Sequence, residues 1–163
     1  MNVRIGSAER RPRRFVVAPA TEVPPGARRC LEAGGRAIVV FNVDGCFYGL
    51  RDACPHRGAR LSGGTIVGGA VSAREPGEYE YDSARRFLKC PWHGWEFDLA
   101  TGKSWVDPLR SRVRTYEVDV EPGEQIRTRG GPSAVEGPYV AETVMVTVED
   151  EYVVVVLDRE AFA

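Results

Sequence analysis

Short runs of β-branched and aromatic residues, separated by turn signals, dominate this chain. Apolar and polar side chains alternate in Tyr116–Val120, which is typical of a half-buried strand. The continuous apolar run Val153–Val156 instead indicates a strand that is buried on both faces. Together these patterns predict strands at Phe15–Ala18, Arg36–Val43, Phe47–Leu50, Phe87–Lys89, Trp95–Leu99, Tyr116–Val120, Glu142–Val148 and Tyr152–Leu157.

Turn signals indicate how some of these strands connect. Asp44-Gly45 separates two apolar runs, which is a strong signal for a tight hairpin. Glu149-Asp150-Glu151 lies between the last two runs, so we expect a final hairpin there. Few segments have the 3.6-residue period of a helix. The pattern therefore predicts an all-β domain, either an antiparallel sandwich or a squashed barrel.

The size and charge of the chain narrow its class. At 163 residues it should form one domain with a real core. Its 22 basic and 23 acidic residues nearly balance, so the total charge gives no indication of nucleic-acid or membrane-surface binding. No run approaches the roughly 20 apolar residues that span a bilayer.

The N-terminal segment carries four arginines between positions 10 and 14, before a short apolar run. A twin-arginine export signal would need an apolar region of roughly 7–15 residues, and Pro19 and Glu22 interrupt this one. We therefore expect a flexible basic arm over residues 1–13, a single domain over 14–163, and a cytoplasmic protein.

Both histidines of the chain occur beside a cysteine, in Cys54-Pro55-His56 and in Cys90-Pro91-Trp92-His93. Two such pairs fit a [2Fe–2S] centre in which two thiolates hold one iron and two imidazoles hold the other. Glycine follows each histidine, at Gly58 and Gly94, and should let the backbone approach the cluster sulfurs. A structural zinc ion on the same four residues is the main alternative, although zinc sites more often group like ligands together.

The two loops, 54–59 and 90–98, resemble those of the Rieske family, and most of all its soluble ferredoxins and the Rieske domains of ring-hydroxylating oxygenases. The resemblance implies a [2Fe–2S] cluster on Cys54, His56, Cys90 and His93, held in a small cluster-binding subdomain of about residues 51–110. It implies the same sandwich or squashed-barrel fold. Asp107-Pro108-Leu109 resembles the proline loop that covers the cluster in this family.

Departures from the family pattern are equally informative. The intervals 64–86 and 121–139 look like insertions relative to compact members, and long loops are often functional. Ala59 and Trp92 stand where the high-potential branch has disulfide cysteines, while Trp95 and Phe97 stand where it has hydroxyl donors to sulfur. Fewer donors stabilise the reduced state less, which predicts a potential toward the low end of the Rieske range, about −150 to +300 mV.

Other residues have weaker interpretations. All three tryptophans lie between 92 and 105, where they could shield the cluster or simply pack the subdomain. Cys30 and Cys46 are expected to be small buried hydrophobes.

The sequence lacks the residues of a catalytic iron site and of a nucleotide-binding site, which favours an electron carrier over an enzyme. No histidine remains for the two-histidine, one-carboxylate iron of an oxygenase, and no glycine-rich nucleotide fingerprint is present. We therefore expect a Rieske electron-transfer protein, a ferredoxin component that carries one electron from a reductase to an oxygenase or similar terminal enzyme, with the partner docking over His56 and His93. The alternative is a small non-catalytic Rieske subunit of a larger oxidoreductase complex, whose contacts the two insertions would make. The oligomeric state is not predicted.

Overall fold

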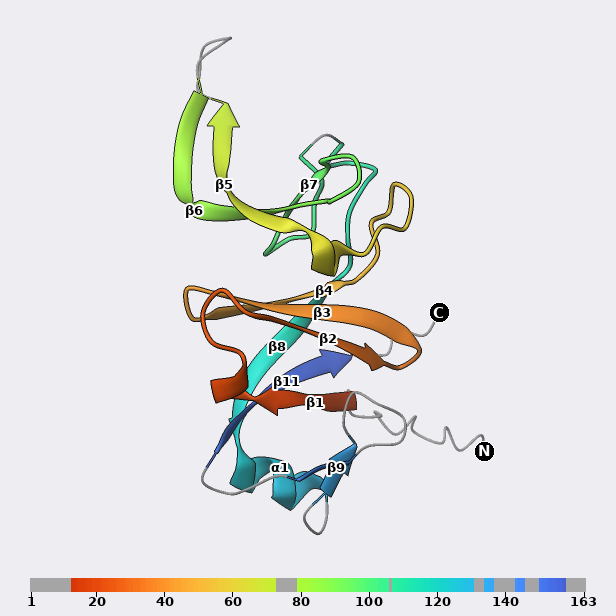
Figure 1. Ribbon diagram of the computed structural model, residues 1–163, viewed down its shortest axis with the longest axis vertical. Helices are drawn as coiled ribbons and strands as arrows, with labels where there is room; N and C mark the ends of the chain where they lie inside the picture. Colours follow the sequence, from red (N-terminus) through yellow and green to blue (C-terminus); the bar gives the residue numbers. More distant parts are fainter. Residues whose placement is uncertain are drawn as a thin grey trace, which may run out of the picture.

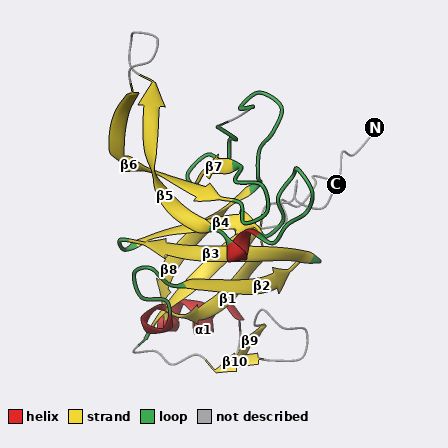
Figure 2. Cartoon of the chain, turned by 45° about the horizontal axis from the view of Figure 1, so that its top comes forward, coloured by secondary structure: helices red, strands yellow, loops and turns green. Residues whose placement is uncertain are grey.

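The computed structural model describes residues 13–72, 79–105, 107–130, 134–136, 143–145 and 150–157, which form three antiparallel sheets (Figures 1 and 2). The largest sheet has the strand order β1 (Arg13–Pro19), β11 (Glu151–Leu157), β8 (Thr115–Pro122), β4 (Cys46–Arg51), β3 (Arg36–Val43), β2 (Arg28–Ala33). A second sheet contains β5 (Thr65–Ser72), β6 (Tyr79–Lys89) and β7 (Glu96–Asp98), and a third pairs β9 (Ala134–Glu136) with β10 (Thr143–Met145). The other described elements are helix α1 (Gly123–Gly130) and the 3₁₀ turns η1 (Ala20–Glu22) and η2 (Leu61–Gly63). The predicted all-β class is confirmed.

The six-stranded sheet curls into a nearly closed barrel around an apolar interior. Alternate residues of its strands fill this interior, among them Phe15, Leu31 and Tyr116. Val153 and Val155 of β11 point into the same core, whereas Val154 packs on the other face of the strand. The prediction that this run is buried on both faces is therefore confirmed.

Strand β3 also has two buried faces, and one of them packs against the predicted cluster-binding loops. Ile38 and Val40 belong to the barrel interior, while Val39 and Phe41 belong to a second core. That second core also includes Cys54 and Cys90, and the small three-stranded sheet contributes to it from above (Figure 1). The predicted cluster-binding loops are thus packed directly onto the outer face of the barrel.

The end of the chain connects differently from the prediction. Segment 143–145 pairs with 134–136, and β11 lies between β1 and β8, so the expected final hairpin of 142–148 with 152–157 was wrong. Residues 142 and 146–149 are outside the described residues. By contrast, β3 and β4 form the expected hairpin, with Val43 opposite Cys46 across Asp44-Gly45.

Helix α1 covers part of the barrel beside β1 and β11, at the end opposite the predicted cluster loops (Figure 1). Its only buried large side chain, Ile126, packs against Val16 and Val154. The Glu121 carboxylate, almost fully buried, accepts a 2.7 Å hydrogen bond from Arg129 and pairs with Arg14 at 2.5 Å. A single apolar contact leaves little periodic signal, which is why the sequence did not predict this helix.

The predicted insertions contain regular structure where they are described. The interval 64–86 holds β5 and most of β6, which form a long ribbon projecting beyond the rest of the small sheet (Figure 2). The interval 121–139 holds the end of β8, α1 and β9. Of the predicted basic arm, Arg13 is already in β1, and residues 1–12 are outside the described residues.

The two remaining cysteines and the possibility of a membrane-spanning helix were also considered in the sequence. Cys30 and Cys46 are both exposed, so the prediction that they are buried was wrong. Across the described residues, no helix combines the length and the apolarity needed to cross a membrane.

Candidate metal centre

The two predicted ligand loops share one backbone conformation. In the first, the Cys54 amide donates to the carbonyl of Ala59 at 2.9 Å, and the Gly58 amide donates to the carbonyl of Cys54 at 2.7 Å. The same two bonds, at 2.7 and 3.1 Å, close residues 90–95. The sequence therefore folds each Cys-Pro segment into the same tight turn, although the histidine falls one position later in the second loop.

Glycine is required in both turns by conformation. Gly58 has φ +75° and Gly94 has φ +70°, in the left-handed region that other residues rarely adopt. A Cβ added at Gly58 would meet no atom within 4 Å, so the position has room for a side chain. The amides that do hydrogen-bond to the Cys54 sulfur belong to His56 and Arg57. The glycines thus shape both turns, and in the first loop the residues before Gly58 supply the donors.

The four predicted ligands gather at one end of the molecule. Cys54 and Cys90 are each 3% exposed, and their thiols hydrogen-bond to each other. His56 and His93 are both exposed, with ring centroids 4.8 Å apart and planes at 75°. The thiols therefore lie inside the second core, and the imidazoles lie at the surface.

The surroundings of Cys54 affect its ionisation. Burial raises the pKa of the Cys54 thiol, and its contact with Cys90 raises it further. The amides of His56 and Arg57 act in the opposite direction, since they donate to the sulfur and favour the thiolate. These amides are positioned to compensate the charge of a thiolate ligand.

The tryptophans differ in their relation to this site. The Trp95 indole stacks on the His56 ring, with centroids 4.8 Å apart and planes at 12°. Trp92 is 62% exposed and meets His93 only edge to face, at 6.4 Å. Trp95 alone therefore covers the face of a predicted ligand among the three tryptophans.

Trp105 and Pro108 lie elsewhere in the subdomain. Together with Arg85 and Phe87, they line a surface cavity of about 400 Å³. Trp105 meets the Phe87 ring edge to face at 5.6 Å, so it packs the small sheet. That the loop around Pro108 covers a cluster stays a prediction.

Asp52 fastens the first ligand loop to the barrel. Its buried carboxylate accepts hydrogen bonds from the amide and hydroxyl of Ser62, at 2.7 and 2.9 Å, and from Arg60 at 3.3 Å. Arg28 of β2 donates to the carbonyls of Ser62 and Gly64 at 2.6 and 2.8 Å. The loop is therefore held from both sides, and sequence reasoning missed these residues because the contacts are not local.

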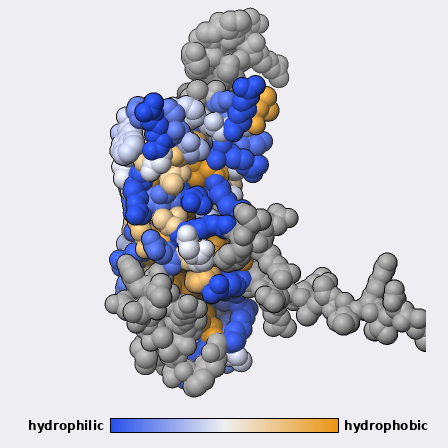
Figure 3. Space-filling view, turned by 90° about the vertical axis from the view of Figure 1, so that its right-hand side faces the viewer, coloured by the Kyte–Doolittle hydropathy of each residue, from blue (hydrophilic) through white to orange (hydrophobic). Residues whose placement is uncertain are grey.

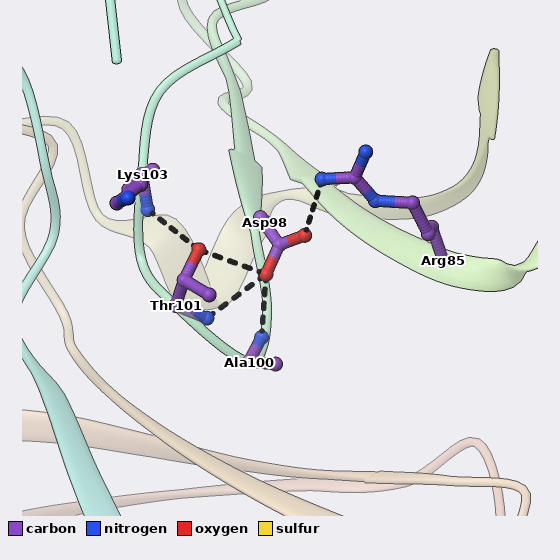
Figure 4. A network of polar contacts seen from close by, with 5 residues as sticks. All are labelled: Arg85, Asp98, Ala100, Thr101 and Lys103. Carbon is purple, nitrogen blue, oxygen red and sulfur yellow. Dashed lines mark hydrogen bonds and ion pairs between the residues drawn. The ribbon is translucent and has the colours of Figure 1, made fainter. Parts of the chain in front are cut away.

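Asp98 fastens the turn that follows the second ligand loop (Figure 4). Its Oδ1 accepts hydrogen bonds from the Ala100 amide at 3.0 Å and from the amide and hydroxyl of Thr101 at 2.9 and 3.0 Å. Its Oδ2 accepts one from Arg85 at 3.2 Å. Burial raises the pKa of Asp98, but these donors outweigh it and hold the pKa below its ordinary value. An aspartate just before a Thr-Gly turn is a local signal that could have revealed this role.

Replacing Asp98 with asparagine should lower the free energy of unfolding by about 1–2 kcal/mol at neutral pH, because hydrogen bonds to a charged acceptor are lost. A lowered pKa in the folded state contributes stability above the unfolded pKa of about 3.9, and this contribution disappears as pH falls through the folded pKa. The gap between wild type and Asp98→Asn should therefore narrow below about pH 4. Urea unfolding of the metal-loaded protein over a pH series measures it.

Asp44→Asn is the matched control for this prediction. Asp44 also pairs with an arginine, Arg86 at 3.2 Å, but its side chain is 78% exposed. Such surface pairs contribute little, so we expect a change within about 0.5 kcal/mol at every pH. A gap for Asp98→Asn that stays constant from pH 7 to pH 3 would contradict the proposed role of its charge.

The donor arrangement is compatible with a binuclear cluster. Within the described residues, no three His, Cys, Asp or Glu side chains converge closely enough to hold a single metal ion. A Rieske cluster makes no such demand, since each iron takes only two protein ligands. Two adjacent buried thiols and two adjacent exposed imidazoles would be suitable pairs.

Comparisons with known proteins agree with this chemistry. A family model for the Rieske [2Fe-2S] domain matches residues 13–117. The ferredoxin component of the naphthalene 1,2-dioxygenase/salicylate 5-hydroxylase systems of Ralstonia sp is 29% identical over 100 residues, covering 61% of this chain and 80% of the relative. The 3-phenylpropionate/cinnamic acid dioxygenase ferredoxin subunit of Escherichia coli K12 is 32% identical over 111 residues, covering 68% and 89%.

A solved structure extends the likeness in fold over more of the chain. It is a Mycobacterium tuberculosis protein assigned as an NADH-dependent nitrite reductase small subunit, with 17% identity and a TM-score of 0.60. The match covers 90% of this chain and 96% of that one. With a family match over most of its length and ligand loops of the expected pattern, this chain belongs to the Rieske [2Fe–2S] family.

Proposed function

We propose that this chain is a Rieske-type ferredoxin, which accepts one electron from a reductase and passes it to an oxygenase or a similar terminal enzyme. The observation that carries the proposal is the pairing of buried thiols with exposed imidazoles at one end of the molecule. The relatives that match most of their own length are themselves ferredoxin components of dioxygenase systems. The sequence has no further histidine with which to build an oxygenase iron site.

Cys54 and Cys90 would hold one iron of a [2Fe–2S] cluster, and His56 and His93 would hold the other. When bound, such a cluster supplies a one-electron couple. The protein buries the thiol side in the second core, which excludes water from it. It leaves the imidazole side at the surface, where a partner can approach closely, and Trp95 keeps the His56 ring in one orientation.

The domain organisation and the location belong to the same proposal. A single domain over 14–163, with a cluster-binding subdomain at about 51–110, is supported by the core that β3 shares with the ligand loops. A cytoplasmic location is part of the same proposal, and cell fractionation tests it.

A small non-catalytic subunit of a larger oxidoreductase is the second candidate. The ferredoxin relatives align with only 61–68% of this chain, so about a third of it has no counterpart there. Such added surface could hold a permanent partner. The carrier should purify alone and cycle freely between redox states, whereas a subunit should co-purify with a large chain.

Spectroscopy of the protein purified without oxygen tests the proposal. We expect about two irons and two acid-labile sulfides per chain, visible absorption, and a Rieske-type EPR signal after reduction with dithionite. Protein-film voltammetry should give a midpoint potential near the low end of the Rieske range. A colourless protein that contains zinc would contradict the proposed function, and a midpoint above about +150 mV would contradict the low potential alone.

A further inference from the structure

The charges of this chain are unevenly distributed. Segments 51–64 and 84–114, which contain the ligand loops and the turns that support them, carry ten Lys or Arg against four Asp or Glu. Over the whole chain the two kinds nearly balance, at 22 against 23. These two segments therefore have a net positive charge, and the rest of the chain, including residues 65–83 between them, carries the compensating negative charge.

Few acidic groups at this end can offset its cations. Asp52 and Asp98 are both buried, and both are already hydrogen-bonded within the subdomain. Only Glu96 and Asp107 remain among the acidic residues of the two segments, and neither is fully exposed. The potential at the surface of this end is therefore set by basic side chains.

Three of these cations lie beside the predicted ligands. Arg57 follows His56 directly and is exposed. The Arg60 side chain is 67% exposed, with one 3.3 Å contact to Asp52. Lys89 precedes Cys90 and is exposed, and its Cε lies 3.3 Å from the position of a Cβ built on Gly94. We name Arg57, Arg60 and Lys89 the basic collar.

The basic collar is accompanied by an exposed aromatic side chain. Trp92, 62% exposed, is the largest apolar group at the tip of the second ligand loop and lies beside His93. Exposed tryptophan and arginine are the residue types most enriched at the centres of protein interfaces. Figure 3, which draws one face, shows hydrophilic residues at this end and over the rest of that face, with apolar areas between them.

The opposite end of the molecule has no such excess of cations. Residues 13–19, 115–130 and 150–157 carry six Asp or Glu against four Arg, and α1 lies at the end far from the ligand loops (Figure 1). A molecule charged in this way orients in the field of a charged partner before contact, which raises the rate of productive encounters.

From these observations we propose that the basic collar selects redox partners with an acidic docking face, and that it orients the exposed imidazoles toward them. This inference rests on the proposed function, because the same end exchanges the electron. Its new content is the sign of the partner's charge. A redox partner with a basic face should meet this end slowly at low ionic strength.

Two small redox ions of opposite charge test the sign directly. Reduced holoprotein is mixed in a stopped-flow instrument with ferricyanide, an anion, or with tris(phenanthroline)cobalt(III), a cation, from about 10 to 500 mM salt. The rate with ferricyanide should fall as salt rises and the rate with the cobalt complex should rise, because salt screens attraction and repulsion alike. Equal or reversed slopes would overturn the proposal.

Protein probes extend the test to a docking face. Reduced flavodoxin, an acidic donor, should reduce the oxidised holoprotein fastest at low salt. Cytochrome c, a basic acceptor, should show the opposite salt dependence. Flavodoxin rates that do not depend on salt would overturn the proposal as surely as a reversed slope.

Arg57→Glu supplies the decisive variant, and Arg127→Glu is its matched control. Both residues are exposed, and Arg127 lies on α1 at the opposite end. We expect Arg57→Glu to slow reduction by flavodoxin roughly tenfold at low salt, with little effect at 500 mM, while Arg127→Glu stays near wild type. Equal effects of the two variants would show that total charge, and not the collar, controls the rate.

If the Arg57→Glu protein binds no cluster, the Lys89→Gln protein is used in its place. It should weaken the salt dependence without reversing it, and an unchanged slope would count against the collar. Visible absorption and EPR on each sample separate the two proposals. A protein that lacks the cluster contradicts the proposed function, whereas a normal cluster with the wrong salt dependence contradicts only the acidic partner.

Discussion

Replacing Cys90 with serine is expected to reduce the iron and sulfide content of the protein from about two each per chain to nearly none. The thiolate is the ligand that a ferric cluster requires, and a serine hydroxyl does not ionise near neutral pH to take its place. Cys90 is 3% exposed and contacts Cys54, so no water or other side chain can substitute from solvent. Cys54→Ser should have the same effect, because each thiol would supply half of the protein ligands of one iron.

Cys46→Ser is the control for this prediction. It removes the same atom from a cysteine that is exposed at the first residue of β4. Iron, sulfide, visible absorption and the EPR signal should all match wild type. Retention of both irons in Cys90→Ser would refute the assignment of this ligand, and loss of iron in Cys46→Ser would show that the assay reports folding.

Local chemistry explains which parts of the fold and the site could be predicted. The β3–β4 hairpin follows from Asp44-Gly45, whose two residues suit the tight turn between adjacent strands. The ligand loops follow from short segments in which Pro restricts the backbone and Gly permits a left-handed conformation, and both loops close with the same pair of hydrogen bonds. In each case the determining residues are within a few positions of one another.

The placement of β11 shows where such reasoning fails. Its apolar run correctly indicated two buried faces, but its neighbours, β1 and β8, are both separated from it by other elements. A turn signal reports only the local backbone, and the acidic turn before β11 suggested pairing with the nearest run. Pairing of distant strands depends on which surfaces remain to be covered, and a local pattern does not contain that information.

The burial of the cysteines was wrongly predicted, and the role of the supporting carboxylates was missed, for a related reason. Cys30 lies on β2, where Leu31 and Ala33 are buried and Cys30 itself is exposed. A preference of cysteine for burial is an average over many sites, and the strand's alternation decides the individual case. Asp52 likewise takes its role from Ser62 and Arg60, which reach it only once the loop has folded.

Gly102→Ala is expected to destabilise the protein by more than about 3 kcal/mol, because two costs act together. Gly102 has φ +70°, a conformation that costs an alanine about 1–2 kcal/mol. A Cβ at this position would also lie 2.0 Å from the carbonyl oxygen of Val113, which is backbone and can move only with the segment that leads into β8. The Gly102 carbonyl accepts a 2.8 Å hydrogen bond from the Val113 amide, so the shift would break this pairing as well.

Gly35→Ala separates the two costs, since Gly35 has φ +72° but a Cβ there would meet no atom within 4 Å. It should lose only the conformational part, about 1–2 kcal/mol. Thermal unfolding of the metal-loaded proteins should therefore give a clearly lower Tm for Gly102→Ala than for Gly35→Ala, since each kcal/mol lowers Tm by roughly 2–4 °C in a chain of this size.

Because the Gly102 amide also donates to the carbonyl of Asp98 at 2.7 Å, the turn beside the second ligand loop should loosen in Gly102→Ala. Iron should then be released faster to a chelator in Gly102→Ala than in Gly35→Ala, and equal release from the two variants would show that this turn does not support the cluster site.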